Sequence, residues 1–328
     1  AQIISGGEVT IDASTETNVE NDNNESWLRD GSVILKMKKN LNENYTMDFS
    51  SALQTSPTYL RRTDQNNLIN RKNSLNTTLN IKGYEILESN DTLAFTIAGY
   101  QVVRNNEDNK TTPTSFPYVK YVSGNRDFRG NNYKNNLIFY NIFRDVSTAD
   151  HAQQQQKLGH SLDSKKIFYK LHSKLTFKTE FHTQVYNIEN RKINNEDYSG
   201  TYSRIFPMSG LYFETPFVNK KYNFYVTPKI FTVINGSQSN SDKISVEESA
   251  DVNYSLLNFE ALNRYTGTDK LDNSKRVSYG VDMRKDNYSL ELGQSYELDI
   301  QNNDFTKNVG LYDYMSDVLG IAKYDGTK

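Results

Sequence analysis

The sequence predicts an all-β protein whose strands form an antiparallel transmembrane β-barrel. Three observations support this fold class: long stretches in which apolar and polar residues alternate, a polar composition that is rich in aromatic rings, and connections of two contrasting lengths. The mean hydropathy is -0.75, yet 23 Tyr and 16 Phe occur among the 328 residues. Because unfolded chains are poor in such rings, the composition indicates strands with one apolar face and one wet face.

The clearest alternating stretch covers residues 171–185. Its apolar side chains occupy odd positions, namely Leu171, Leu175, Phe177, Phe181 and Val185. The even positions carry charged or polar residues. Period two sustained through this stretch predicts a strand longer than the ~5–6 residues usual in globular sheets. It also exceeds the ~9–11 residues that a tilted membrane strand needs.

Further strand-like stretches recur along the chain, whereas no helical period of useful length occurs. At ~10 residues per strand plus connections, the chain holds about 12–16 strands. The predicted strands cover residues 8–13, 32–38, 45–53, 74–84, 92–103, 116–122, 136–144, 167–188, 202–214, 222–234, 252–259, 277–284 and 288–300.

The connections between these strands fall into two classes. Short ones include 88–91 and 285–287, where Asp and Asn suit tight turns. Short turns on one rim and long loops on the other are typical of outer-membrane barrels. The long polar connections are 105–113, 145–166, 190–199, 236–249 and 302–316.

Proline positions give a separate expectation about the sheet. Because proline has no N–H for a β-ladder, we expect Pro207, Pro216 and Pro228 each to interrupt or end strand pairing.

Charge and cysteine content exclude several classes of function. The charges of the 38 basic and 40 acidic residues nearly cancel. The chain therefore has no strong positive electrostatic potential to attract nucleic acid, and we expect no nucleic-acid partner. The absence of cysteine excludes disulfides and thiolate metal sites. The first residues have no basic and apolar leader pattern, and no run of ~18 apolar residues predicts a membrane helix.

Four histidines invite a metal-site hypothesis: His151, His160, His172 and His182. If His172 and His182 lie on one strand, they are about 33 Å apart at ~3.3 Å per residue, too far to share a metal. His151 and His160 fall in a Gln-rich predicted loop. We therefore interpret all four as solvated polar-face or loop residues, and predict no metal site and no cofactor.

The sequence contains no convincing catalytic motif. Gly159–Asp163 includes Ser, His and Asp, but a catalytic triad is defined by geometry and not by adjacency. The carboxylate pairs Glu247–Glu248 and Asp269/Asp272 are interpreted as solvated loop charges or loose sites for divalent cations. We expect no enzyme activity and no catalytic or cofactor-binding residues. Residues that bind a substrate stay unassigned.

Several short motifs follow one another in an order that resembles a known family. The motifs are PTYLRR (57–62), FPYVKY (116–121), FPMSGLYFETP (206–216), VTP (226–228), EES (247–249), LNRYTGTD (262–269), RVSYG (276–280), GQSY (293–296) and GLYDYMSDV (310–318). With these motifs the chain is similar, over roughly residues 45–320, to the lipopolysaccharide-assembly outer-membrane protein family LptD (also called OstA or organic solvent tolerance protein), in an alphaproteobacterial form.

The resemblance implies a function in lipopolysaccharide transport at the outer membrane of Gram-negative cells. It implies lipopolysaccharide and outer-membrane lipids as partners, an LptE-like lipoprotein plug in the lumen, and a periplasmic bridge protein that docks on an N-terminal jellyroll domain. We expect residues 1–328 to be one barrel segment that lacks this jellyroll domain and the last strands. Such a segment would be an incomplete portion of a large barrel of about 26 strands.

Two other interpretations stay open at the level of sequence. One is a passive porin-like outer-membrane channel, which would show an open, plug-independent solute pore. The other is a soluble or surface-exposed β-rich adhesin, which would fold without detergent.

Overall fold

The fold is an antiparallel β-sheet, which confirms the predicted all-β class. In the computed structural model, the described residues form a 17-stranded sheet. These residues are 2–4, 7–16, 30–56, 59–63, 74–88, 90–103, 108–236, 240–250, 253–256, 258–300, 305, 309–311 and 313–326.

Long strands dominate the sheet, and helices are limited to α1 (Tyr59–Thr63), η2 (Asn109–Thr111) and η3 (Lys220–Tyr222) among the described residues. Three strands have only three residues each: β1, β8 and β13. Without these three, the count lies within the predicted range. The strands are β1 (Gln2–Ile4), β2 (Gly7–Glu16), β3 (Asp30–Asn40), β4 (Tyr45–Gln54), β5 (Ser74–Tyr84), β6 (Thr92–Val102), β7 (Thr114–Val122), β8 (Arg126–Phe128), β9 (Asn131–Phe143), β10 (Gln154–Lys170), β11 (Ser173–Ile193), β12 (Glu196–Glu214), β13 (Phe217–Asn219), β14 (Phe224–Asn235), β15 (Lys275–Lys285), β16 (Tyr288–Glu297) and β17 (Leu319–Tyr324).

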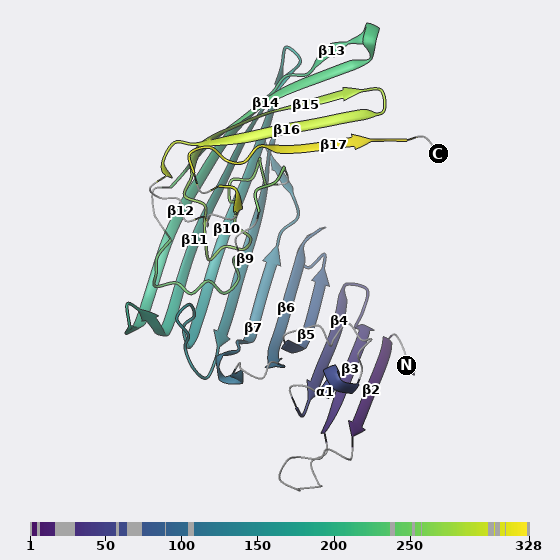
Figure 1. Ribbon diagram of the computed structural model, residues 1–328, viewed down its shortest axis with the longest axis vertical. Coiled ribbons are helices and arrows are strands. Elements are labelled where there is room, and N and C mark those ends of the chain that lie inside the picture. The colour runs from purple at the N-terminus through teal and green to yellow at the C-terminus, as the bar shows by residue number, and fades with distance from the viewer. Residues whose placement is uncertain are drawn as a thin grey trace. The chain divides into compact units, whose positions relative to one another are not determined.

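Neighbouring strands in the chain pair with each other as antiparallel hairpins, as β2 to β7 show (Figure 1). Successive hairpin connections therefore lie at opposite strand ends. The connections at one end of the strands are short and include residues 41–44, 85–91, 171–172 and 286–287. The connections at the other end are longer and include residues 103–113, 144–153, 236–274 and 298–318. The predicted contrast between short turns and long loops is confirmed, with one exception at 194–195.

Three sequence predictions are wrong in their boundaries. The predicted strand 167–188 is two strands, β10 and β11, joined by a turn at Leu171 and His172, both with positive φ. Most of the predicted loop 145–166 is therefore β10. The predicted loop 190–199 is a tight turn at Asn194 and Asn195, again with positive φ. Both turns preserve the alternation around them, so periodicity alone does not reveal them.

Two further differences concern residues near the C-terminal part. The described part of the predicted strand 252–259 is not a strand but belongs to the long connection between β14 and β15. Conversely, β17 pairs with β16 although no strand was predicted there. Its exposed sequence, Leu319–Tyr324, is too short to show a clear period.

The proline prediction is confirmed for Pro216, which lies between β12 and β13. Pro228 pairs with Val281 of β15 on one edge, while on its other edge the pairing changes from β13 to β12. Pro207 does not break β12, but the pairing of β12 with β14 begins only at Met208. Pro207 and Pro228 thus each interrupt pairing with only one neighbouring strand, the one toward which the missing N–H would point.

The described chain divides into two compact units. Unit 1 contains residues 1–124, 136–159 and 185–202, and unit 2 contains 125–135, 160–184 and 203–328. In unit 1, α1 packs on the sheet through Tyr59 and Leu60, which join Ile34, Leu75 and other buried residues in a core cluster. Gln101 completes this region by exchanging two hydrogen bonds with the backbone of Gln54.

The strands of unit 2 have two distinct faces. Large apolar side chains are exposed on one face, which we call the outer face: Phe177 and Phe181 on β11, Leu211 and Phe213 on β12, and Ile230 and Ile234 on β14. The alternate residues form the inner face, with Lys178, His182 and Gln184 on β11. Because exposed apolar side chains recur at every second position on neighbouring strands, the outer face suits contact with lipid.

No described helix has the length and apolar character of a membrane span.

The outer face gives a first prediction. In lipid vesicles, Phe181→Arg should lower the free energy of unfolding by about 2–4 kcal/mol, because the charge is placed in hydrocarbon. Denaturant titration monitored by tryptophan or tyrosine fluorescence measures the change. The control Asn132→Arg, at an exposed position on the inner face of β9, should change it by less than about 0.5 kcal/mol. Equal effects of the two variants would contradict the assignment of the faces.

Candidate functional site

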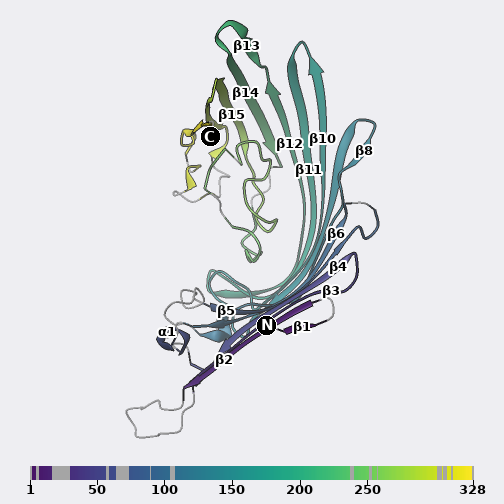
Figure 2. The ribbon, with the colours of Figure 1, turned by 90° about the vertical axis from the view of Figure 1, so that its right-hand side faces the viewer.

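The connection between β14 and β15, residues 236–274, folds along the inner face of unit 2. We call its described part the inner loop; Figure 2 shows this connection to one side of β11 and β12. Its Leu262 and Leu271 join one buried cluster with Phe206, Met208 and Tyr212 of β12 and Phe231 and Val233 of β14. The inner face is therefore apolar at this place, where five strand side chains pack with two leucines of the inner loop.

A second contact joins the inner loop to the connection between β16 and β17. Tyr265 of the inner loop stacks on Phe305 at a centroid distance of 4.4 Å. Tyr254 N donates a hydrogen bond to Val309 O at 2.9 Å. These residues belong to a second buried apolar cluster with Phe259 and Leu311. The two long connections thus support each other on the inner face.

Four buried charged residues tie the inner loop to β15 and β16. We call Arg264, Asp272, Arg276 and Glu297 the ionic cluster. Arg264 Nε lies 2.6 Å from Asp272 Oδ2, and Arg264 Nη2 lies 3.2 Å from Glu297 Oε2. Arg276 Nη1 lies 3.2 Å from the same Asp272 oxygen. The side chains of Arg264 and Asp272 are only 1% and 2% exposed.

Burial makes the pairing of these charges essential. Burial acts to lower the pKa of Arg264, but the carboxylates of Asp272 and Glu297 raise it above its ordinary value. The guanidinium therefore stays charged at any physiological pH. Arg276 adds hydrogen bonds to Ala261 O and to Ser274 Oγ, which anchor both ends of the segment that carries Arg264.

One of the two carboxylate pairs predicted to be solvated is structural, namely Asp269 and Asp272. Asp269 and Asp272 are buried, so the prediction of solvated loop charges is wrong for both. Asp269 Oδ2 accepts hydrogen bonds from the backbone N–H groups of Glu247 and Glu248, each at 2.9 Å. Thr268 Oγ1 donates to Glu248 Oε1 at 2.7 Å. Two segments of the inner loop that are about twenty residues apart are held together in this way.

Arg204 connects the inner loop to the strand wall. It is buried on β12 and its Nε donates to Gln184 Oε1 of β11 at 2.6 Å. Its Nη2 donates to the carbonyl oxygens of Thr268 and Asp269, at 2.7 and 2.6 Å. Gln184 Nε2 donates to the same Thr268 carbonyl at 2.9 Å. Arg204 and Gln184 therefore tie β11 and β12 to backbone carbonyls of the inner loop.

Lysines of the inner face pair with carboxylates across neighbouring elements. Lys174 Nζ lies 2.8 Å from Glu214 Oε1, and Lys178 Nζ lies 3.4 Å from Glu260 Oε2 of the inner loop. Lys229 bridges Asp282 and Glu291, which face each other directly on β15 and β16. Without Lys229, these two like charges would repel each other across the strands.

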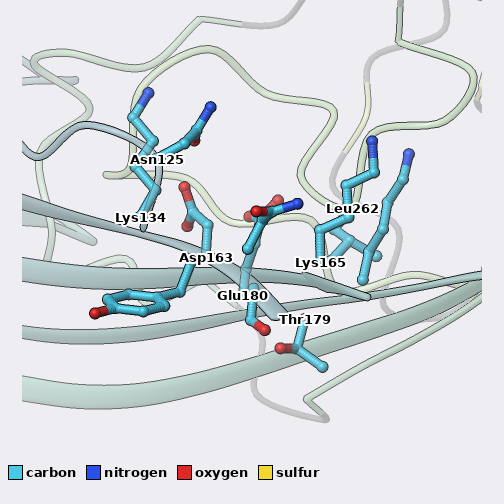
Figure 3. A pocket seen from close by; sticks show the side chains of 11 residues that line it. Asn125, Lys134, Asp163, Lys165, Thr179, Glu180 and Leu262 are labelled. Atoms are coloured by element: carbon cyan, nitrogen blue, oxygen red, sulfur yellow. The ribbon is translucent and has the colours of Figure 1, made fainter. Parts of the chain in front are cut away.

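A cavity of about 360 Å³ lies between β9, β10, β11 and the inner loop. Figure 3 shows Lys134, Asp163 and Glu180 pointing from the strands toward the space beside Leu262. We call this space the inner cavity. Its lining residues are Asn125, Asn132, Tyr133, Lys134, Asp163, Ser164, Lys165, Lys178, Thr179, Glu180 and Leu262.

The structure separates the four histidines. His172 lies in the turn between β10 and β11, and His160 lies within β10, where its Nε2 is 3.1 Å from Asn135 Oδ1. His182 is 3% exposed and its Nε2 is 3.3 Å from Glu180 Oε2. The predictions that His160 lies in a loop and that His182 is solvated are therefore wrong. His151 lies in the connection before β10.

The Ser, His and Asp residues of the sequence 159–163 do not form a triad. They follow one another along β10, so His160 projects to the opposite face from Ser161 and Asp163. Within the described ranges, no three or more His, Cys, Asp or Glu side chains are grouped to hold a metal ion.

Comparison with protein families identifies the chain. The family model described as LPS transport system D, LptD, matches residues 29–327. The chain belongs to the LptD family. No sequence among the curated proteins matches it. Membership in this family implies lipopolysaccharide transport at the outer membrane and explains the all-β antiparallel sheet as part of an outer-membrane β-barrel.

The LptD motifs noted in the sequence coincide with the residues that fix the inner loop. LNRYTGTD (262–269) carries Leu262, Arg264 and Asp269, and RVSYG (276–280) begins with Arg276. Sequence reasoning used these motifs only as a fingerprint and assigned no role to Arg264, Arg276 or Glu297. Two arginines near acidic residues, in a stretch flanked by long strands, are the signal by which Arg264 and Arg276 could have been found.

The ionic cluster gives a second prediction. Arg264→Met should weaken the attachment of the inner loop by about 3–5 kcal/mol, because Asp272 and Glu297 lose a buried counter-charge. Hydrogen exchange of the Leu271 amide, which donates to Asn240 Oδ1, reports the release. The control Lys275→Met removes the more exposed pair with Asp299 and should cost less than about 1 kcal/mol. Unchanged protection of Leu271 in Arg264→Met would show that the cluster does not hold the loop.

Gly267 gives a third prediction. It has φ +67°, and a Cβ there would lie 2.3 Å from Glu248 O. Gly267→Ala should destabilise the inner loop by about 3 kcal/mol through backbone strain and this clash. The matched control is Gly130→Ala, because Gly130 has φ +76° but nothing within 4 Å of its Cβ. Limited proteolysis should cut the inner loop faster only in the first variant, and equal cleavage of both would refute the steric argument.

Proposed function

We propose that this chain forms part of the barrel wall through which lipopolysaccharide crosses the outer membrane and enters its outer leaflet. The family match over residues 29–327 carries the proposal. Membership in the LptD family implies transport of lipopolysaccharide. The further step that we propose is that lipopolysaccharide passes along the strands of this chain. The mechanism is guided translocation, in which no covalent bond is made or broken.

The two faces of the strands support this route. An amphiphile needs an apolar phase for its acyl chains and a wet, polar path for its sugars. The outer face carries residues such as Phe177 and Phe213, whereas the inner face carries Lys174, Lys178 and Glu180. Charged and amide side chains on the inner face can exchange hydrogen bonds with saccharides and phosphates as they pass.

The inner loop favours this function over a passive porin-like channel. It covers part of the inner face and is fixed by the buried ionic cluster. A soluble adhesin is disfavoured because exposed aromatic and aliphatic side chains repeat along the outer face. The porin-like alternative makes a different prediction in the experiment below.

The partners and the organisation of the complete protein are part of the proposal. We propose that residues 1–328 act as one barrel segment in the outer membrane of a Gram-negative cell. A lipoprotein plug of the LptE type would meet the inner face, and a periplasmic bridge protein would deliver lipopolysaccharide through a separate N-terminal domain. Pull-down of these two proteins with the full protein tests this part independently.

Photo-crosslinking in living cells tests the route, and it is the fourth prediction. A photoreactive amino acid at Lys174 or Glu180, on the inner face, should form adducts with lipopolysaccharide in transit. These adducts should disappear when lipopolysaccharide synthesis is blocked. At Phe177 or Phe181, on the outer face, adducts should form with resident membrane lipids and persist during the block.

Two results would contradict the route. One is the absence of lipopolysaccharide adducts at both inner positions while the outer positions react with lipid. The other is an open solute pore in the purified full protein, measured by single-channel conductance, that does not depend on any plug. The latter result would favour the porin-like alternative.

A further inference from the structure

The strands β2, β3 and β4 of unit 1 also have two distinct faces. Val33 lies directly opposite Ala13 on one side and Leu53 on the other, so these three exposed side chains form one row across the strands. Ile34 and Ala52, at neighbouring positions, point to the other face, where they belong to the core cluster that packs with α1. We call the face that carries the row of Ala13, Val33 and Leu53 the apolar face of unit 1.

A groove of about 540 Å³ is hollowed into the apolar face of unit 1, where β2 ends, β3 begins and β4 ends. We call it the outer groove. It contains the apolar row and, next to it, Thr15, Gly31 and Thr55. Thr15 is opposite Gly31, whose N–H donates to Thr55 Oγ1 at 2.8 Å. Because Gly31 has no side chain, the space between the two threonines stays open. The volume falls in the range of ~300–1,000 Å³ typical of ligand pockets.

The outer groove lies beside an opening in the β-ladder. The pairing of β4 with β5 stops at Ser51 and Thr77, although β4 continues to Gln54 and β5 begins at Ser74. Gln101 of β6 lines the groove and bridges this opening. Its Nε2 donates to Gln54 O at 2.7 Å, and its Oε1 accepts from Gln54 N at 3.0 Å. One side-chain amide therefore takes the place of a strand neighbour and satisfies backbone groups at membrane depth.

The hydroxyl groups of the lining residues also bond within the protein. Ser14 Oγ and Ser32 Oγ lie 3.0 Å apart. Thr15 Oγ1 donates to Asp30 O at 3.2 Å, and Thr55 Oγ1 donates to Asp30 Oδ1 at 3.3 Å. A ligand in the outer groove therefore gains little from polar contacts, and its binding energy comes from the hydrocarbon that it buries against the apolar row.

Charge selects among the lipids that could enter the outer groove. None of the described residues that line it is charged, whereas five charged side chains line the inner cavity. A glycolipid with several phosphate groups would find no cation among these lining residues, but the acyl chain of a phospholipid needs none. The groove opens on a face whose exposed side chains include Ile11, Val33 and Leu53, and such a face suits contact with lipid.

We propose that the outer groove binds one acyl chain of a membrane phospholipid as a resident ligand of the barrel wall. The chain lies across Ala13, Val33 and Leu53 and covers the opening between β4 and β5. There it excludes water from the amide of Gln101, whose hydrogen bonds to Gln54 are stronger in an apolar medium. The inference goes beyond the proposed function and does not depend on the route of lipopolysaccharide.

Photolabelling of the full protein tests the proposal. The protein is stripped of lipid in a rigid sterol-based detergent, which offers the groove no flexible chain. Phosphatidylethanolamine with a diazirine near the end of one acyl chain is then titrated, and mass spectrometry locates the labelled residues. Labelling of Val33 and Leu53 should saturate at one phospholipid per protein. Labelling of Phe181, on the outer face of unit 2, should rise in proportion to the probe because lipid only passes there.

A variant that fills the outer groove gives the decisive comparison. Ala13→Trp should lower the labelling of Val33 and Leu53 by at least about 10-fold, because a chain that loses two buried methylene groups already binds about that much more weakly. The matched control Val9→Trp places the same side chain on the same face of β2 but outside the groove, and should leave the labelling unchanged. Heat-modifiable electrophoretic migration confirms that each variant is folded.

Three results would overturn the inference. Labelling of Val33 and Leu53 that rises in proportion to the probe, as at Phe181, would show ordinary contact with lipid. Unchanged labelling in Ala13→Trp would place the chain elsewhere. In the unaltered protein, displacement of the probe by lipopolysaccharide at lower concentrations than by unlabelled phospholipid would assign the groove to a different lipid. None of these results bears on the adducts at Lys174, which test the proposed route alone.

Discussion

The pairing of Arg264 with Asp272 is the interaction on which the inner face depends. Burying a guanidinium and a carboxylate costs several kcal/mol per ion unless each finds partners. Here Glu297 and Arg276 complete the set, so that β15, β16 and the inner loop share one network. Irregular backbone is tolerated at membrane depth only where it is buried in protein or lines a wet cavity. The ionic cluster meets that requirement by holding the loop on the side away from lipid.

The same rule organises the strands. The backbone groups of each strand form hydrogen bonds with neighbouring strands. The side chains on the two faces of the sheet can therefore differ in polarity. Apolar residues such as Phe181 can then meet lipid, and every adjacent position can meet water, charge or the inner loop. The route that we propose for lipopolysaccharide uses both environments in one wall. Membership in the LptD family and the side-chain pattern therefore agree on the same kind of wall, with one apolar face and one polar face.

Much of the sheet is predictable from sequence because alternation is a local property. β5 begins and ends where the sequence predicts, and β6, β15 and β16 are found with small errors. β10 escapes prediction because its first residues, Gln154–Lys157, are polar on both faces. The turn at Leu171 escapes because a two-residue turn leaves the period in phase.

The candidate site is less predictable, for a different reason. Arg264 and Glu297 are thirty-three positions apart, and nothing local to either residue indicates that they meet. Asp272 looks solvated in the sequence although Arg264 and Arg276 are only eight and four positions away, because its burial depends on how the inner loop packs on the strands.

The position of Glu297 at the end of β16 has a consequence for the order of folding. Arg264 cannot find both of its carboxylates until β16 has paired with β15 and brought Glu297 beside Lys275 and Arg276. The inner loop precedes both strands in the chain, yet its final contacts require them. The contact between Arg264 and Glu297 therefore forms only once the β15–β16 hairpin is complete, whereas the contacts of the loop with β12 and β14 do not depend on that hairpin.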